Sequence, residues 1–132
     1  MSGLTRCRFN CDNFFEVSVN FSFNPHILPA YRGMLTTIYC NLNESFTIEK
    51  IENIYNSFYN NFAFVNILKD NIRADFFKVQ NTNFCLIKLY KVETNKLIIV
   101  SLIDNLIKGG AGQAIQCFNL LENYKETTSF NI

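Results

Sequence analysis

Apolar and polar residues alternate along FFEVSVNFSF, the first patterned stretch of the chain, at residues 14–23. An alternation with a period of two is typical of a strand that buries one face. We therefore expect a strand over residues 14–23, followed by a loop over residues 24–33 that contains both prolines and ends at Gly33. The next run, MLTTIYCNL at residues 34–42, is rich in β-branched and aromatic residues, so a second strand is predicted there.

The period changes in TIEKIENIYNSFYNNF, at residues 47–62. Apolar residues now recur every three or four positions, as they do on one face of a helix: Ile48, Ile51, Ile54, Tyr55, Phe58 and Phe62. Thr47 is a suitable N-cap, and Glu49 places a negative charge in the first turn, where the helix dipole favours it. A helix is predicted from this pattern, with its apolar face against the sheet.

The rest of the chain favours three extended segments and a last helix. AFVNIL (63–68) reads as a short strand. Residues 76–103 read as extended structure that ends in a hairpin with its turn near Glu93–Asn95. A helix is expected at about residues 106–121. The predicted order β-β-α-β-β-β-α indicates an α+β domain with a mostly antiparallel or mixed sheet and helices on one face. The expected divisions are an irregular segment (1–13), the α+β domain (14–103) and a helix with a tail (104–132).

Composition narrows the class of protein. The chain has 132 residues, which suits one domain, and a formal net charge of +1 without a basic stripe, so no nucleic-acid partner is expected. No apolar run reaches 18 residues, which predicts no membrane partner and no leader. The five cysteines form no C-x-x-C pair, and only one histidine is present. We expect free thiols in the cytoplasm and no metal site.

The stretch SLIDNLIKGGAGQAIQ (101–116) carries the candidate chemistry. Gly110, Gly112 and Ala114 fit G-x-G-x-A between a predicted strand and a predicted helix. A dinucleotide-binding unit would need a second parallel strand and an acidic residue after this helix, and a P-loop would place the lysine after the glycines. Two interpretations stay open. The small residues let another backbone pack closely, or they help to hold a ligand whose main fold is supplied elsewhere.

Three motifs carry a family resemblance. IDNLIKGGAGQAIQCFNLLENYKET (103–127) resembles the pattern DNL-x-KG-x-AGQA-x-Q-x-x-N followed by E-T-x-G-L. FNPHILPAYRGMLTTIY (23–39) is similar to F-x-PHLLP-x-x-RG, and KVQNTNFCLI (78–87) more weakly to V-x-G-S-N-x-C-x-I. These patterns belong to the C-terminal part of the N-acetyl-gamma-glutamyl-phosphate reductases of the semialdehyde dehydrogenase superfamily. The chain departs from them at Asn81, Asn123 and Ser129, at or beside positions where the family has glycine. These departures suggest relaxed selection or local loosening.

The resemblance implies an NADPH-dependent oxidoreductase of arginine biosynthesis, which reduces N-acetyl-glutamyl phosphate to the semialdehyde. In that family a Rossmann domain comes first, and a cysteine in S-N-P-G-C-Y and a histidine in H-x-H-x-P-E-I do the chemistry. Neither motif occurs in this chain. No catalytic residue is therefore assigned, and we expect no activity from the chain alone. Expected partners are a second copy or a complementing N-terminal half, with small-molecule substrate only in the complete enzyme. The alternative is a non-catalytic remnant or a dimerising or docking subunit.

By the same resemblance, the residues expected near NADP are Asn105, Lys108, Gly109, Gly110 and Gly112. A glycine-rich helix start offers N–H groups and close approach, although a helix that only packs domains together is the alternative. Asp104 is predicted to cap this helix. Arg32 could bind an anionic group of the substrate, since guanidinium matches phosphate or carboxylate, and its alternative is a loop ion pair. His26 is expected to be a loop or interface residue.

Overall fold

A computed structural model of the chain describes residues 23–27, 29–43, 45–93 and 95–131. The chain divides after Ala30 into two units, and the helices and strands of the described residues lie in the second. The predicted strand 14–23 lies outside the described residues except for Phe23, and so does the predicted irregular segment 1–13. Within the first unit, His26 Nδ1 lies 3.0 Å from the backbone oxygen of Asn24, so this side chain contacts its own loop.

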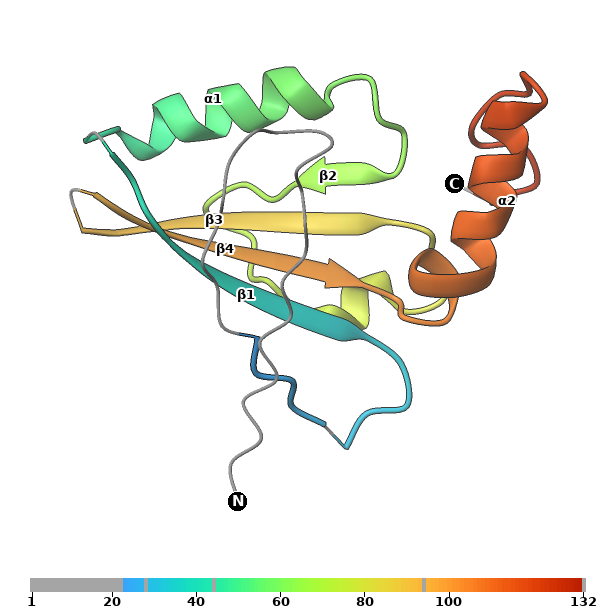
Figure 1. Cartoon of the computed structure of the whole chain (residues 1–132), viewed down its shortest axis with the longest axis horizontal. Helices are drawn as coiled ribbons and strands as arrows, with labels where there is room; N and C mark the ends of the chain where they lie inside the picture. The colour runs from blue at the N-terminus through green and yellow to red at the C-terminus, as the bar shows by residue number, and fades with distance from the viewer. Residues whose placement is uncertain (1–22, 28, 44, 94, 132) are drawn as a thin grey trace. The chain divides into compact units, whose positions relative to one another are not determined.

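The strands of the second unit form a mixed sheet in the order β1-β4-β3-β2 (Figure 1). Their bounds are Met34–Asn41 (β1), Val65–Ile67 (β2), Cys85–Glu93 (β3) and Lys96–Ile103 (β4). β4 is antiparallel to both β1 and β3, whereas β2 is parallel to β3. The register pairs Glu93 with Lys96, which confirms the predicted hairpin. The sheet and helices together confirm the predicted α+β class. No helix in the described part of the chain is long and apolar enough to cross a membrane.

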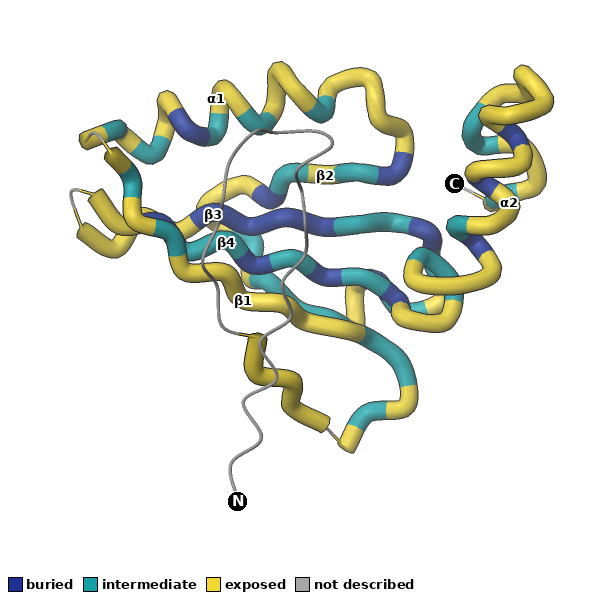
Figure 2. The backbone as a smooth tube through the Cα atoms, in the orientation of Figure 1, coloured by how far each residue is buried: buried dark blue, intermediate teal, exposed yellow. Residues whose placement is uncertain are grey.

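Helix α1 (Ile48–Tyr59) covers one face of the sheet. Thr47 caps it as predicted, because its Oγ1 accepts a hydrogen bond from the Lys50 N–H at 3.3 Å. Ile51 is buried against a cluster of alternate residues from β3 and β4: Ile87, Leu89 and Leu97. Figure 2 shows this buried centre along β3 and β4, while β1 and the outer side of α1 are exposed.

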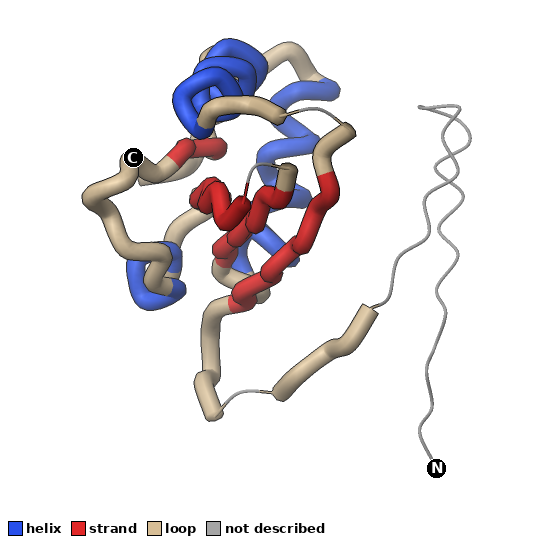
Figure 3. The backbone as a smooth tube through the Cα atoms, turned by 90° about the vertical axis from the view of Figure 1, so that its left-hand side faces the viewer, coloured by secondary structure: helices blue, strands red, loops and turns tan. Residues whose placement is uncertain are grey.

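The opposite face is covered by the segment between β2 and β3, which Figure 3 places across the strands from α1. Residues 76–79 form a short 3₁₀ helix within it, so the prediction of extended structure from residue 76 is wrong. Asp75 accepts a hydrogen bond from the Phe77 N–H at 3.0 Å, which caps a helical turn. Val79 then enters the core with no exposed surface, and strand pairing starts only at Cys85.

The last predicted helix is present but does not begin as a regular α-helix. Residues Ile107–Ala111, here named the glycine turn, make hydrogen bonds five residues apart, such as Gly109 N–H to the Asp104 carbonyl at 2.9 Å. Helix α2 follows at Gly112–Leu121 and stands at the end of the sheet where β4 ends and β3 begins (Figure 1). The tail folds back along it, and the Phe130 ring packs on that of Phe64 at 4.7 Å.

Among the described residues, three that are not glycine adopt positive φ angles, and they are the positions noted above as departing from the family pattern. Asn81, Asn123 and Ser129 have φ angles of 61°, 57° and 69°. Glycine adopts this region freely, and asparagine enters it more readily than most other residues. The backbone therefore keeps the left-handed turns that the family's glycines suit, which argues against the interpretation of these departures as local loosening.

Candidate functional site

Asp104 is the centre of the candidate site. It follows β4 directly, and its side chain has no exposed surface. Its carboxylate accepts hydrogen bonds from the backbone N–H groups of Leu106 at 2.8 Å and Ile107 at 3.0 Å, which confirms the predicted cap. The Asn81 N–H donates to the same carboxylate at 2.8 Å, and Arg32 Nη1 does so at 3.1 Å.

Burial and hydrogen bonding act in opposite directions on the Asp104 carboxyl. Burial raises its pKa, because a low-dielectric environment disfavours the charged form. The backbone donors of Asn81, Leu106 and Ile107, together with Arg32, favour the charged form and outweigh burial, so the pKa lies below its ordinary value. Asp104 is therefore a permanently ionised anchor near neutral pH.

Two predicted site residues from distant parts of the sequence meet beside this carboxylate. Arg32 forms an ion pair with Asp104, and its side chain is 29% exposed. Asn105 accepts a hydrogen bond through Oδ1 from the Gly33 N–H at 2.9 Å. Gly33 has a φ of 112°, and the Phe76 ring lies against it, so a side chain at this position would be strained. The candidate substrate residue and the candidate cofactor residue thus lie on adjoining loops.

The amine of Lys108 is directed into the protein. Its Nζ donates to Gln113 Oε1 at 2.8 Å and to Gln116 Oε1 at 2.6 Å, and it lies 5.6 Å from the centre of the Phe64 ring. Desolvation lowers the pKa of this amine, and the nearby Cys85, Glu126 and Cys117 groups oppose that shift. An electrostatic effect of Lys108 on a ligand at the exposed surface of the glycine turn would therefore act through the turn and not by direct contact.

Gln116 joins Lys108 to the tail, and the sequence did not single it out. It is 8% exposed, and its Oε1 also accepts from Asn83 Nδ2 at 3.0 Å. Its Nε2 donates to Glu126 Oε1 at 2.6 Å, and Glu126 Oε2 accepts from the Ala63 N–H at 3.3 Å. Asn119, one turn further on, donates to the carbonyls of Glu126 and Thr128. The i, i+3 spacing of Gln116 and Asn119 in AGQAxQxxN was the available signal, because it places both amides on one helix face.

The glycines fall into two groups. Gly112 is buried, and a Cβ there would overlap Asn83 Oδ1 and lie 2.7 Å from Ile107 Cγ2. Gly109 and Gly110 are exposed, and a Cβ at either would meet no atom closer than 3.4 Å. Close packing thus explains Gly112, whereas Gly109 and Gly110 leave a small, open surface beside Asn105.

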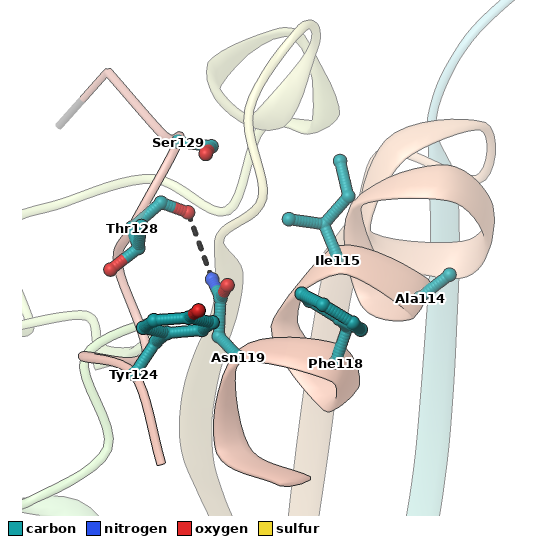
Figure 4. A pocket seen from close by; sticks show the side chains of 7 residues that line it. All are labelled: Ala114, Ile115, Phe118, Asn119, Tyr124, Thr128 and Ser129. Carbon is teal, nitrogen blue, oxygen red and sulfur yellow. Dashed lines mark hydrogen bonds between the residues drawn. The ribbon is translucent and has the colours of Figure 1, made fainter. Parts of the chain in front are cut away.

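Helix α2 and the tail enclose a cleft of about 370 Å³ next to this turn (Figure 4). Its lining residues are Ala114, Ile115, Phe118, Asn119, Tyr124, Thr128 and Ser129. Phe118 and Tyr124 remain more than half exposed, so the cleft presents aromatic surface to its surroundings. Within the described ranges, no three His, Cys, Asp or Glu side chains come close enough together to hold a metal ion.

The comparison with known families agrees with this geometry. A family model described as "Semialdehyde dehydrogenase, dimerisation domain" matches residues 8–105. The chain belongs to this family. The match covers the whole sheet, and it ends at Asn105, just before the glycine turn.

Several curated proteins that are similar to this chain are named N-acetyl-gamma-glutamyl-phosphate reductase. The N-acetyl-gamma-glutamyl-phosphate reductase of Clostridium beijerinckii is 41% identical over 118 residues, which are 89% of this chain and 34% of that protein. The reductase of Brachyspira hyodysenteriae is 42% identical over 121 residues (90% and 34%), and that of Acinetobacter baylyi is 42% identical over 106 residues (80% and 30%). This chain thus spans about a third of the length of these relatives. A match over 89% of the chain leaves out only about a tenth of it, so the similarity continues through the glycine turn.

Proposed function

We propose that this chain supplies the C-terminal part of an N-acetyl-gamma-glutamyl-phosphate reductase, an NADPH-dependent enzyme of arginine biosynthesis in the cytoplasm. The observation that carries this proposal is the identity of about 40% to reductases of that name over nine-tenths of the chain, glycine turn included. The Rossmann domain and the catalytic cysteine and histidine would come from another polypeptide or from the rest of a longer protein. Without them the chain is inactive, because catalytic groups act as a unit.

The exposed surface of the glycine turn is the part of this chain that we assign to NADP. Several N–H groups of the turn are already used, since those of Leu106 and Ile107 donate to Asp104 and that of Gly109 donates to a carbonyl. The proposal therefore depends on close approach at Gly109 and Gly110 and on the Asn105 amide, more than on a free helix N-terminus. Lys108 stabilises the turn from its inner side, through hydrogen bonds to Gln113 and Gln116.

Arg32 is assigned to the substrate side. One side of its guanidinium is neutralised by Asp104, and 29% of the side chain remains exposed for an anionic group. A guanidinium held by a carboxylate is fixed in orientation, so it can present its remaining N–H groups to a carboxylate or phosphate in a bidentate way. Its distance from Asn105 is set by the adjoining Gly33.

The test is reconstitution. We would mix this chain with a polypeptide that contains the N-terminal two-thirds of the Clostridium beijerinckii relative and follow NADPH oxidation with N-acetyl-glutamyl phosphate. Turnover should appear in the mixture and in neither part alone. We infer that the N-terminal part contacts the exposed aromatic surface of the cleft, so Phe118→Asp should reduce turnover, whereas the matched Phe58→Asp on α1 should not. The two side chains are similarly exposed, at 56% and 66%, and neither is one of the buried residues of the core clusters. A bound, saturated mixture without turnover would refute the reductase proposal.

A second candidate function is a dimerising subunit without catalysis. The dimerisation-domain match favours it, because that match covers most of the chain. β1 also exposes several large apolar side chains: Met34, Leu35, Ile38 and Tyr39. Sedimentation of the chain alone distinguishes the candidates when combined with the mixing assay. A dimer that never supports turnover would favour this second function, and a chain that gains activity on mixing would exclude it.

A further inference from the structure

Asp104 connects three segments that are far apart in the sequence. Its carboxylate binds the Arg32 guanidinium from the loop before β1, the Asn81 N–H from the loop before β3 and two N–H groups at the start of the glycine turn. The three segments are also linked to one another. Gln80 Nε2 donates to the Arg32 carbonyl at 2.8 Å, and the Gly33 N–H donates to Asn105 Oδ1 at 2.9 Å.

These contacts close two rings that share the pair Arg32–Asp104. One ring runs through Gln80 and Asn81, and the other through Gly33 and Asn105. A buried carboxylate whose oxygens all have donors keeps its orientation, and groups in a closed hydrogen-bonded ring cannot move independently. The Asn81 backbone, with a φ of 61°, is held in this arrangement by its N–H group.

Asp75 is an example of an aspartate that caps a helical turn without contacting distant segments. Its Oδ1 accepts the N–H of the residue two positions on, Phe77 at 3.0 Å, as Asp104 does with Leu106. Asp75 has no described partner outside its own turn. The two aspartates thus share the local geometry and differ in the connections to distant loops.

We propose that Asp104 is a positioning residue that holds the Arg32 loop and the glycine turn as one unit, so that the substrate-side and cofactor-side groups of the reductase site keep a fixed separation. The structural part of this inference stands on the two rings. Its catalytic meaning rests on the proposed function.

The first test uses the 132-residue chain and an Asp104→Asn variant, which keeps the side-chain shape and removes the charge. Amide hydrogen exchange and ¹⁵N chemical shifts would be recorded for both proteins by NMR. We expect exchange to accelerate at least tenfold at Asn81, Leu106 and Ile107, and also at Gly33, which does not touch Asp104. The control Asp75→Asn should accelerate exchange at Phe77 and leave exchange unchanged at Asn81, Leu106 and Ile107. Because the Phe76 ring lies against Gly33, Gly33 is read in this control by its exchange rate and not by its chemical shift. Unchanged exchange and shifts at Gly33 would reduce Asp104 to a local cap and overturn the proposal.

A second variant keeps the test decisive if Asp104→Asn does not fold. Arg32→Lys retains the positive charge but removes the planar guanidinium donor. Residue 32 lies outside the glycine turn, so this change does not alter the turn directly. The rings predict shift changes at Leu106 and Ile107 in this variant, across the carboxylate. No change there would overturn the coupling.

The reconstituted reductase then tests the catalytic meaning separately. Asp104→Asn should lower kcat/KM at least tenfold, with KM for both NADPH and the acyl phosphate raised, while Asp75→Asn should leave both constants unchanged. A variant with altered exchange at Gly33 and normal kinetics would refute the catalytic role. Altered exchange together with no activity in the wild-type mixture would refute the proposed function and leave the rings intact.

Discussion

Leu89 in the middle of β3 and Asp104 just beyond β4 are equally buried, at 1% and 0% exposed, but they hold their surroundings by different interactions. Leu89 packs among the apolar side chains that line α1 and the sheet, and this attraction has no direction. Asp104 is held by donors at 2.8–3.1 Å, each of which must keep its position. The region of α1 and the sheet should therefore accept changes of shape but not of volume. The region of Asp104 and α2 should be sensitive to single atoms.

The largest effect is expected in the apolar region. Leu89→Ala should lower the free energy of unfolding by about 2–5 kcal/mol, because it removes buried methyl groups and leaves a cavity. Leu89→Met, which keeps the volume, should lower it by less than about 1.5 kcal/mol. Urea denaturation of both variants measures the two values. Equal losses for the two variants would show that this core also depends on detailed shape, and the contrast between the regions would disappear.

A smaller loss with a sharper position dependence is expected at the glycines. Gly112→Ala adds one methyl group against Asn83 Oδ1 and Ile107, so we expect a loss of about 1–3 kcal/mol. Gly109→Ala, three residues earlier, meets no atom closer than Ile103 Cδ1 at 3.4 Å and should change stability by less than about 1 kcal/mol. Thermal unfolding of the two variants under one set of conditions provides the measurement. Equal tolerance at both positions would remove close packing as the reason for Gly112.

The pH dependence of stability distinguishes the two regions, because Asp104 carries a charge and Leu89 does not. The pKa of Asp104 is lowered in the folded protein, so its carboxylate stabilises the fold above the unfolded pKa of about 3.9, and this stabilisation is lost as the pH falls through the lower, folded value. Each unit of that difference corresponds to about 1.4 kcal/mol. Asp104→Asn cannot titrate there, so the stability difference between wild type and variant should shrink below about pH 4. Leu89→Met, with no charge change, should keep a constant difference from wild type. A pH-independent gap for Asp104→Asn would contradict the assigned pKa shift.

The same contrast explains which parts of the structure the sequence predicted. Apolar spacing correctly indicated α1, because packing on a face repeats with the period of the element, and β-branched and aromatic content correctly indicated β1. It failed at residues 76–79, where Phe76, Phe77 and Val79 suggested a strand but Asp75 caps a helical turn. The glycine motif was recognised, yet the inward direction of Lys108 and the two rings around Asp104 depend on contacts between distant segments, which no local pattern contains.

The smallest change in stability is expected in the tail, which packs against α2 and contains a residue in a strained conformation. Ser129 has a φ of 69°, and a left-handed backbone costs a residue with a Cβ about 1–2 kcal/mol. Glycine removes this strain but gives the unfolded chain more freedom, which offsets about 0.4–1 kcal/mol. Ser129→Gly should thus stabilise the chain by roughly 0.5 kcal/mol, and Thr128→Gly, a neighbour without a positive φ, should destabilise it. Paired thermal melts decide between them. If both glycines destabilise equally, the left-handed turn at Ser129 is not a source of strain, and the tail belongs with the tolerant part of the molecule.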